Sequence, residues 1–475
     1  MFRDPTLEAV GVAGYRWGSF LLETTALFPV DGRGIVETFA GASALTLPFE
    51  TDVRMRAAIA LLHELVHLKQ DLASGIGAHD HLVTRHAAPR LVEQSKWFFG
   101  KFDRQPYREA ALRILADLDQ ASFTDQVRGD LAAVEDRTIG LRQLRGAAWR
   151  TPATSQVLTD MLGPNVELDN LSEHPLRRVL EAEAACETYL HVMRSKVSDI
   201  GVDLLHEREY LWNPILMGED YSSGIISVAL ATDREVGSDQ IRRGMRAYAA
   251  LSSWIAEFAV AYPPPAILAD WRLSRAYFDP VVRYLLALRA LGDMSEPAYE
   301  TLLEAVLDRR WDDFDDTLRA YMRVEYPSTR DIYTAWLDEL EPLATGESWD
   351  APLFALRTAM LRSRLSDTRE TELGAVFTAQ IPIQVIGTGT GLRGIMWGQQ
   401  LYDDKLKRAL LDWNVDRDLY ELFYGSGMFR CIFARSQVCK SRQPRCATGM
   451  TLLSQLPPEE GCQVRRVLHE LGYNI

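Results

Sequence analysis

Apolar residues recur every three or four positions along most of this chain, a spacing typical of helices with one buried face. The segments with this pattern are rich in Ala, Leu, Arg and Glu. They predict helices over residues 53–74, 88–148, 174–198, 236–262, 268–292, 296–325, 329–341 and 350–366. The expected fold is therefore mainly α, with many helices and few short strands.

Strand-like runs and breaks in the helical pattern divide the chain further. The best strand candidates are ALTLPF at 44–49, GIISVAL at 224–230 and IPIQVI at 381–386. Pro, Gly and Ser interrupt the helical pattern at 151–156, 262–266 and 344–352. From these breaks we expect a metal-site domain over 1–230, a helical domain over 231–425 and a four-cysteine module over 426–475.

The segment LLHELVHLKQD at 61–71 carries two histidines four positions apart on a predicted helix. Residues i and i+4 differ by only about 40° of helical rotation, so His63 and His67 share one face. Around His67 the helix has a single polar stripe and is otherwise apolar; the stripe includes Glu64, Gln70 and Asp71. Two imidazoles one turn apart can bind one cation, and the adjacent glutamate can act as general base on a water molecule.

His63-Glu64-Leu65-Val66-His67 resembles the H-E-x-x-H motif of the zincin metallopeptidases. The resemblance covers one helix of the chain, and it implies that His63 and His67 bind zinc while Glu64 activates the attacking water. The metzincin branch would require a glycine at position 70 and a histidine at position 73. This chain has Gln70 and Ala73 there, which excludes that branch.

A third zinc ligand is expected from another part of the chain, because catalytic zinc usually takes three protein ligands. Glutamate-zincins (gluzincins) supply a Glu from a later helix. The stretch RVLEAEAACETYLHVM at 178–193 resembles their E-x-x-A pattern, with Glu181 and Ala184 as the most literal match.

Helical periodicity favours a different glutamate of the same stretch. Glu183 lies at the centre of an apolar stripe, whereas Glu181 lies on the opposite face. A buried carboxylate must be paired, protonated or bound to a metal. We therefore predict Glu183 as the third ligand, with Glu187 as a further ligand or a hydrogen-bonding partner of the site. The alternative is that Arg177 or Arg178 neutralises a carboxylate here.

A rival interpretation uses several of the same residues. Glu64-x-x-His67 is also the E-x-x-H half-site of ferritin-like di-iron proteins, in which further helices contribute glutamates. Glu37 on a small-residue face, together with Glu183 and Glu187, would complete a carboxylate-rich set, although Asp203-x-x-His206 makes only a weak second half-site. Two histidines and one carboxylate could also hold a single Fe(II).

Four cysteines gather within the last part of the chain and suggest a second metal site. Cys431, Cys439, Cys446 and Cys462 are enough for a tetrahedral zinc, although the C-x2-C knuckle of zinc ribbons is missing. We expect a structural zinc there, with an iron–sulfur cluster or reduced structural thiols as alternatives.

Two other motifs receive a structural interpretation. GAHDHLVTRH at 77–86 offers His79, His81 and His86, but it follows two glycines and is expected to form an exposed loop. Gly389-x-Gly391-x-x-Gly394 resembles a dinucleotide fingerprint without a surrounding βαβ unit, so a glycine-rich turn is the better prediction.

Composition limits the possible partners and location. The chain has 475 residues, 47% of them hydrophobic and 25% charged, with a formal charge of −14. No apolar run is long enough for a membrane span, and the acidic total disfavours nucleic acid. No secretory signal is recognisable at the N-terminus, so we expect a cytoplasmic protein.

These patterns together predict a zinc-dependent, peptidase-like hydrolase acting on a peptide or small molecule. His63, His67 and Glu183 would bind the metal and Glu64 would act as base. The alternatives are a non-haem iron or di-iron oxygenase and a binding protein that carries only a structural metal, in which Glu64 has no catalytic task.

Overall fold

Helices dominate the part of the protein that the computed structural model describes. This part comprises residues 13–15, 17–18, 20, 22–25, 52–82, 84–85, 175–194, 224–225, 227–229, 231–232, 238–270, 275–322, 324–365, 382–386, 393–397, 400–401, 405–406, 409–410, 412–414, 417, 429–430, 450–451 and 462. The mainly α prediction is confirmed. No helix within these ranges combines the length and apolar character needed to cross a membrane.

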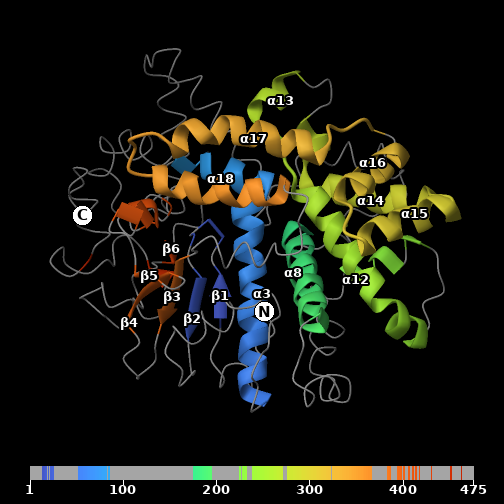
Figure 1. The fold of residues 1–475 in the computed structure, drawn as a ribbon, viewed down its shortest axis with the longest axis horizontal. Coiled ribbons are helices and arrows are strands. Elements are labelled where there is room, and N and C mark those ends of the chain that lie inside the picture. Colours follow the sequence, from blue (N-terminus) through green and yellow to red (C-terminus); the bar gives the residue numbers. More distant parts are fainter. Residues whose placement is uncertain are drawn as a thin grey trace, which may run out of the picture.

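The helix that carries the H-E-x-x-H motif, α3 (Asp52–Ala73), runs through the middle of the molecule (Figure 1). On one side it packs against α8 (Pro175–Arg194), and on the other against the first strand of a small sheet. α17 (Thr329–Ala344) and α18 (Ala351–Leu365) cross over its C-terminal end. Both motif-bearing helices begin and end close to the predicted bounds.

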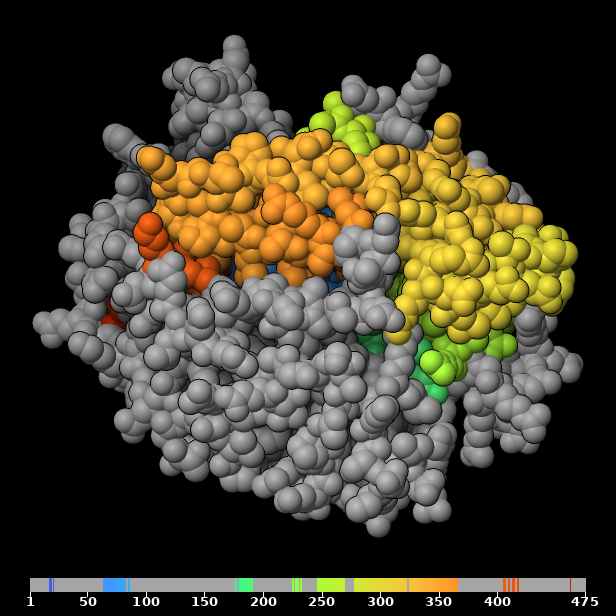
Figure 2. Space-filling view, in the orientation of Figure 1, coloured from blue at the N-terminus to red at the C-terminus, as the bar shows by residue number. Residues whose placement is uncertain are grey.

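Beyond α8, on the side away from the sheet, lie α12 (Ser238–Val260), α14 (Pro280–Asp293), α15 (Glu296–Leu307) and α16 (Trp311–Tyr321). α13 (Pro265–Asp270) lies instead beside α17, and a 3-10 turn at Arg275–Phe278 precedes α14. In Figure 2, α14 to α18 form most of the described surface on the viewed face, and little of α3 or α8 is visible.

Two large hydrophobic clusters hold these helices together. The first joins α8, the segment around Ile225 and Val228, and α12 with α14, α15 and α16. The second joins Ala78 and Leu82 to α17 and α18. A domain boundary was expected near position 230. Described residues before and after this position pack in the same hydrophobic cluster.

The segment GIISVAL was predicted as a strand, and this prediction is wrong. Residues 224–225 and 227–229 are helical, and the Thr232 N–H donates to the Val228 carbonyl four positions earlier at 3.1 Å. Ile225 and Val228 are buried in the first cluster. A short apolar run that is buried on all sides has no alternating pattern, so periodicity does not separate a strand from a helical turn.

The predicted helix 296–325 is broken into α15 and α16. Arg309 between them has a left-handed backbone, with φ of 61°, and the Arg310 N–H donates to the Ala305 carbonyl at 2.7 Å. This turn brings Trp311 and Phe314 of α16 back onto Trp254 of α12, with ring centroids 5.1 and 5.2 Å apart. The aromatic packing explains a break that the apolar periodicity alone does not show.

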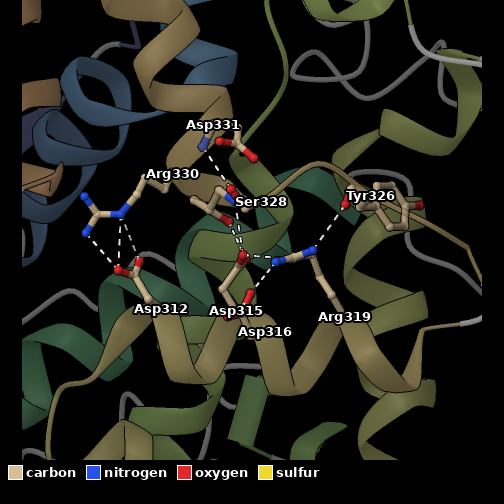
Figure 3. A network of polar contacts seen from close by, with 9 residues as sticks. Asp312, Asp315, Asp316, Arg319, Tyr326, Ser328, Arg330 and Asp331 are labelled. Atoms are coloured by element: carbon tan, nitrogen blue, oxygen red, sulfur yellow. Dashed lines mark hydrogen bonds and ion pairs between the residues drawn. The ribbon is translucent and has the colours of Figure 1, made fainter.

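A polar network fixes the junction between α16 and α17 (Figure 3). The buried Asp315 accepts hydrogen bonds from the backbone N–H and hydroxyl of Thr329, at 3.2 and 2.6 Å, and from Arg319 Nε at 2.9 Å. Ser328 caps α17 by accepting from the Asp331 N–H at 3.0 Å. These contacts satisfy a buried charge and the free N–H groups at the helix start.

A five-stranded sheet lies beside α3, built from both ends of the chain. Its order is β1-β2-β3-β4-β5, with β2 and β3 parallel and the other pairs antiparallel. The strands are β1 (Ala13–Tyr15), β2 (Leu22–Thr25), β3 (Pro382–Ile386), β4 (Arg393–Trp397) and β5 (Gln400–Leu401), and a separate pair joins β6 (Phe429–Arg430) to β7 (Met450–Thr451). The strand predicted at 381–386 is confirmed as β3.

The glycine-rich run lies between β3 and β4, which are antiparallel neighbours. A dinucleotide fingerprint would instead lead from a strand into a helix. Gly394 lies in β4, whereas Gly389 and Gly391 fall outside the described residues, so the predicted glycine-rich turn stays a prediction.

Replacing Asp279 with asparagine is expected to remove a pH-dependent loss of stability. Asp279 is buried and caps α14 by accepting from the Val281 and Val282 N–H groups at 2.8 and 3.3 Å. Burial raises the pKa of this carboxyl from 3.8 to about 7, although the two hydrogen bonds act in the opposite direction. Between about pH 4 and 7 the unfolded chain therefore releases this proton and the folded chain keeps it, so stability falls as pH rises.

Asparagine can form the same cap without the charge. We expect Asp279→Asn to exceed the unmodified protein in unfolding free energy by about 2–4 kcal/mol at pH 8, and by much less near pH 4. Urea unfolding at several pH values measures this difference. Asp293→Asn, at the exposed end of the same helix, is the control and should shift stability little at any pH. If the unfolding free energy of Asp279→Asn depended on pH as that of the unmodified protein does, the raised pKa of Asp279 would be refuted.

Candidate metal centre

Three side chains converge where α3 and α8 pack together. His63 Nε2 and His67 Nε2 lie 3.1 and 3.2 Å from the same oxygen, Oε2 of Glu181, and 3.2 Å from each other. The two histidines come from successive turns of α3, and the glutamate comes from the facing side of α8. They form the one group of three or more potential metal ligands found within the described ranges.

This donor set fits a divalent metal. Tetrahedral ligands about 2.0–2.1 Å from a zinc ion lie roughly 3.3 Å from one another, close to the separations of the three atoms. Two imidazole nitrogens and one carboxylate are also the ligand types that zinc takes in catalytic sites. The three side chains are 15%, 13% and 14% exposed, so solvent can reach the cluster.

A buried amide holds the second histidine. Gln70 Oε1 lies 2.7 Å from His67 Nδ1, and Gln70 Nε2 donates to the Leu180 carbonyl of α8 at 2.9 Å. Gln70 has no exposed surface. His67 is therefore contacted through both ring nitrogens, one by Gln70 and the other by the cluster.

The charges of the cluster support one another. Burial opposes ionisation of Glu181, but hydrogen bonds and the positive charge of His63 and His67 hold its pKa well below the usual range. Burial likewise opposes protonation of His67, but Glu181, Glu64 and Gln70 together raise its pKa to about 9. Without a metal a proton balances the carboxylate, and a bound cation would replace that proton.

Glu64, the predicted base, is partly exposed and immediately follows His63 on α3. Its charge contributes to the raised pKa of His67, which places the carboxylate within electrostatic reach of the cluster. The negative charge of Glu64 is therefore felt at the cluster that contains the two histidines of the motif.

The structure brings Glu181 to the histidines in place of the preferred Glu183. The periodicity argument was right that Glu183 is fully buried, but it faces Lys69, Arg364 and Glu257 in the core. Neither of its carboxylate oxygens has a hydrogen-bond partner among the described residues, and burial raises its pKa to about 7. The ligand was expected on the most apolar face of α8, whereas the cluster lies at a partly exposed edge of that helix.

Glu187 also lies apart from the histidine cluster. Its Oε1 accepts a hydrogen bond from the Ser253 hydroxyl of α12. The E-x-x-A match that begins at Glu181 was the sequence signal for the glutamate that joins the cluster. Gln70 belonged to the polar stripe around His67, but its bond to α8 depends on the pairing of two distant helices.

Two of the later histidines, His79 and His81, are buried, so the expectation of an exposed loop there is wrong. Residues 75–82 are helical, and His79 and His81 are 4% and 1% exposed. His81 stacks on Phe354 of α18 at 4.1 Å and accepts from Arg357 Nε at 3.3 Å. Neither histidine joins the cluster of His63, His67 and Glu181.

Several predicted ligands fall outside the described residues: Glu37, Cys431, Cys439 and Cys446. The same is true of His86, Asp203 and His206. Cys462 is described and is buried. The predicted four-cysteine zinc site and the Glu37 ligand therefore stay predictions.

Comparison with protein-family models, with curated proteins and with solved structures found no match to this chain. The function is therefore argued from the cluster itself, meaning its donor types, separations, burial and charge.

Proposed function

We propose that this protein is a zinc-dependent hydrolase whose metal is held by His63, His67 and Glu181. The observation that supports this most directly is the convergence of both imidazole Nε2 atoms on one oxygen of Glu181, at 3.1 and 3.2 Å. Zinc bound there would supply Lewis-acid activation of a carbonyl group and of a water molecule. A peptide or a small molecule with a scissile carbonyl is the class of substrate that suits this chemistry.

The side chains around the cluster have separate tasks in this proposal. His63, His67 and Glu181 would hold the metal, the usual number of protein ligands for a catalytic zinc. Glu64 accepts a proton from the attacking water and passes it to the leaving group. Gln70 holds His67 in place by the hydrogen bond at 2.7 Å.

The second candidate is a mononuclear Fe(II) oxygenase, because two histidines and one carboxylate are also the facial triad of such enzymes.

The di-iron alternative has less support. It needs several carboxylates around two metals, whereas the cluster holds one, and Glu183 and Glu187 face other partners. Metal analysis of the native protein separates zinc from iron. A zinc content above one per chain would favour a second zinc at the C-terminal cysteines.

Glu64→Gln is the test of the hydrolase. We expect the variant to keep its zinc and to lose about a hundredfold or more of its turnover, since general-base catalysis contributes on this scale. The measurement is cleavage of a quenched fluorescent peptide mixture and of simple esters, beside zinc content. Glu300→Gln, the same change at an exposed position of α15, is the control. Hydrolysis that survives Glu64→Gln, or iron in place of zinc, would contradict the proposal.

A further inference from the structure

Gln70 is the buried residue that touches both helices of the candidate centre. It lies on α3, three positions after His67, and is fully buried. Its side chain reaches His67 at one end and the backbone of α8 at the other. The α8 atom that it contacts, the carbonyl oxygen of Leu180, belongs to the residue just before Glu181.

The second of these contacts fixes the direction of the amide. A backbone carbonyl can only accept a hydrogen bond, so the NH2 group of Gln70 must face Leu180. The amide oxygen then faces His67, at 2.7 Å from Nδ1. Since that oxygen can only accept, His67 must carry a proton on Nδ1.

The position of this proton decides which nitrogen can bind a metal. A neutral imidazole with a proton on Nδ1 has its lone pair on Nε2. The Nε2 of His67 is the atom that lies 3.2 Å from both Glu181 Oε2 and His63 Nε2. One amide therefore selects the histidine tautomer that directs its lone pair into the cluster.

We infer that Gln70 is a positioning residue that sets the tautomer of His67 and connects it to the segment of α8 that carries Glu181. This role rests on a metal at the proposed centre, but it does not depend on which reaction the metal serves. Partners of this kind, one shell out from the metal, typically contribute about 10–100-fold in metal affinity.

Three variants separate this role from ordinary packing. Gln70→Met keeps the approximate size of the side chain and removes both hydrogen bonds. Gln70→Glu keeps an acceptor for His67 Nδ1 and removes the amide donor. Asn414→Leu removes another fully buried amide, which hydrogen-bonds the Leu410 carbonyl in its own segment at 2.8 Å.

The measurements are made on the full chain. Zn²⁺ affinity is measured by competition with a chelating dye, and the Co²⁺-loaded protein is studied by ¹H NMR. We expect Gln70→Met to bind Zn²⁺ about 10–100-fold more weakly and to lose, through rapid solvent exchange, one of the two shifted imidazole N–H resonances of the metal-bound histidines. Gln70→Glu should retain both resonances and stay within a few-fold of the unmodified affinity. Asn414→Leu should change thermal stability alone.

Unchanged Zn²⁺ affinity and N–H resonances in Gln70→Met would overturn the inference. An equal loss in Gln70→Glu would assign the effect to the bond with Leu180 and overturn the role in setting the tautomer. Failure of the unmodified protein to bind Zn²⁺ or Co²⁺ would remove the centre and this role together. Metal binding without hydrolysis would contradict only the proposed function.

Discussion

Glu181→Gln is expected to weaken zinc binding by at least about a hundredfold and to abolish turnover with it. Structural zinc sites bind with about 10–16 kcal/mol through four ligands, so one ligand contributes about 3 kcal/mol. The carboxylate would also balance part of the charge of the metal, and both imidazole Nε2 atoms converge on one of its oxygens at 3.1 and 3.2 Å. An amide supplies neither the charge nor an equally strong ligand. Zinc titration of the metal-free variant measures the loss.

Glu183→Gln is the matched control for this experiment. It is the same change two positions along the same helix, at a residue that faces Lys69, Arg364 and Glu257 instead of the histidines. We expect this variant to bind zinc as the unmodified protein does, with any effect confined to folding stability. The opposite result, zinc lost from Glu183→Gln and kept by Glu181→Gln, would restore the ligand that helical periodicity favoured.

Gly75→Ala is expected to cause a large loss of stability. A Cβ at Gly75 would lie 2.1 Å from the carbonyl oxygen and 2.6 Å from the nitrogen of Tyr262, on the segment after α12. That backbone cannot easily yield, because its carbonyl also accepts from the indole N–H of Trp336 at 2.7 Å. Overpacking of this kind costs about 3 kcal/mol or more when the obstacle is backbone.

The effect is measured as a shift in the urea unfolding midpoint. Gly346→Ala in the exposed turn between α17 and α18 is the control, since the nearest atom to its Cβ would be 3.4 Å away. We expect that variant to change stability by about 0.5 kcal/mol or less. Equal midpoints for Gly75→Ala and Gly346→Ala would contradict the close packing of the helical segment after α3 against the segment after α12.

Local sequence patterns predicted the two helices of the centre but not their mutual orientation. The bounds of α3 and α8 follow from apolar spacing and from the residues at their ends. The choice between Glu181 and Glu183 depends instead on which face of α8 meets α3. Lys69 and Arg364 give the buried Glu183 a positive environment, and these partners come from α3 and α18, far apart in the sequence.

The sheet and the buried histidines show the same limit. β2 pairs with β3 from the opposite end of the chain, and a parallel pairing of this kind leaves no local signature. His81 is buried because Phe354 and Arg357 of α18 cover it. Glycines before a histidine-rich stretch suggested a loop, whereas here Gly75 and Gly77 permit close approach of neighbouring backbone.

The C-terminal end of α3 is held by residues from distant parts of the chain. Asp71, one turn after His67, is completely buried, pairs with Arg357 Nη2 at 3.1 Å and accepts from the Gly18 N–H. An unpaired carboxylate at this depth would be costly, so we expect the helix that bears the imidazoles to be fully fixed only when Arg357 of α18 is in place. In a nascent chain, the candidate metal centre should accordingly form only after α18 has emerged from the ribosome.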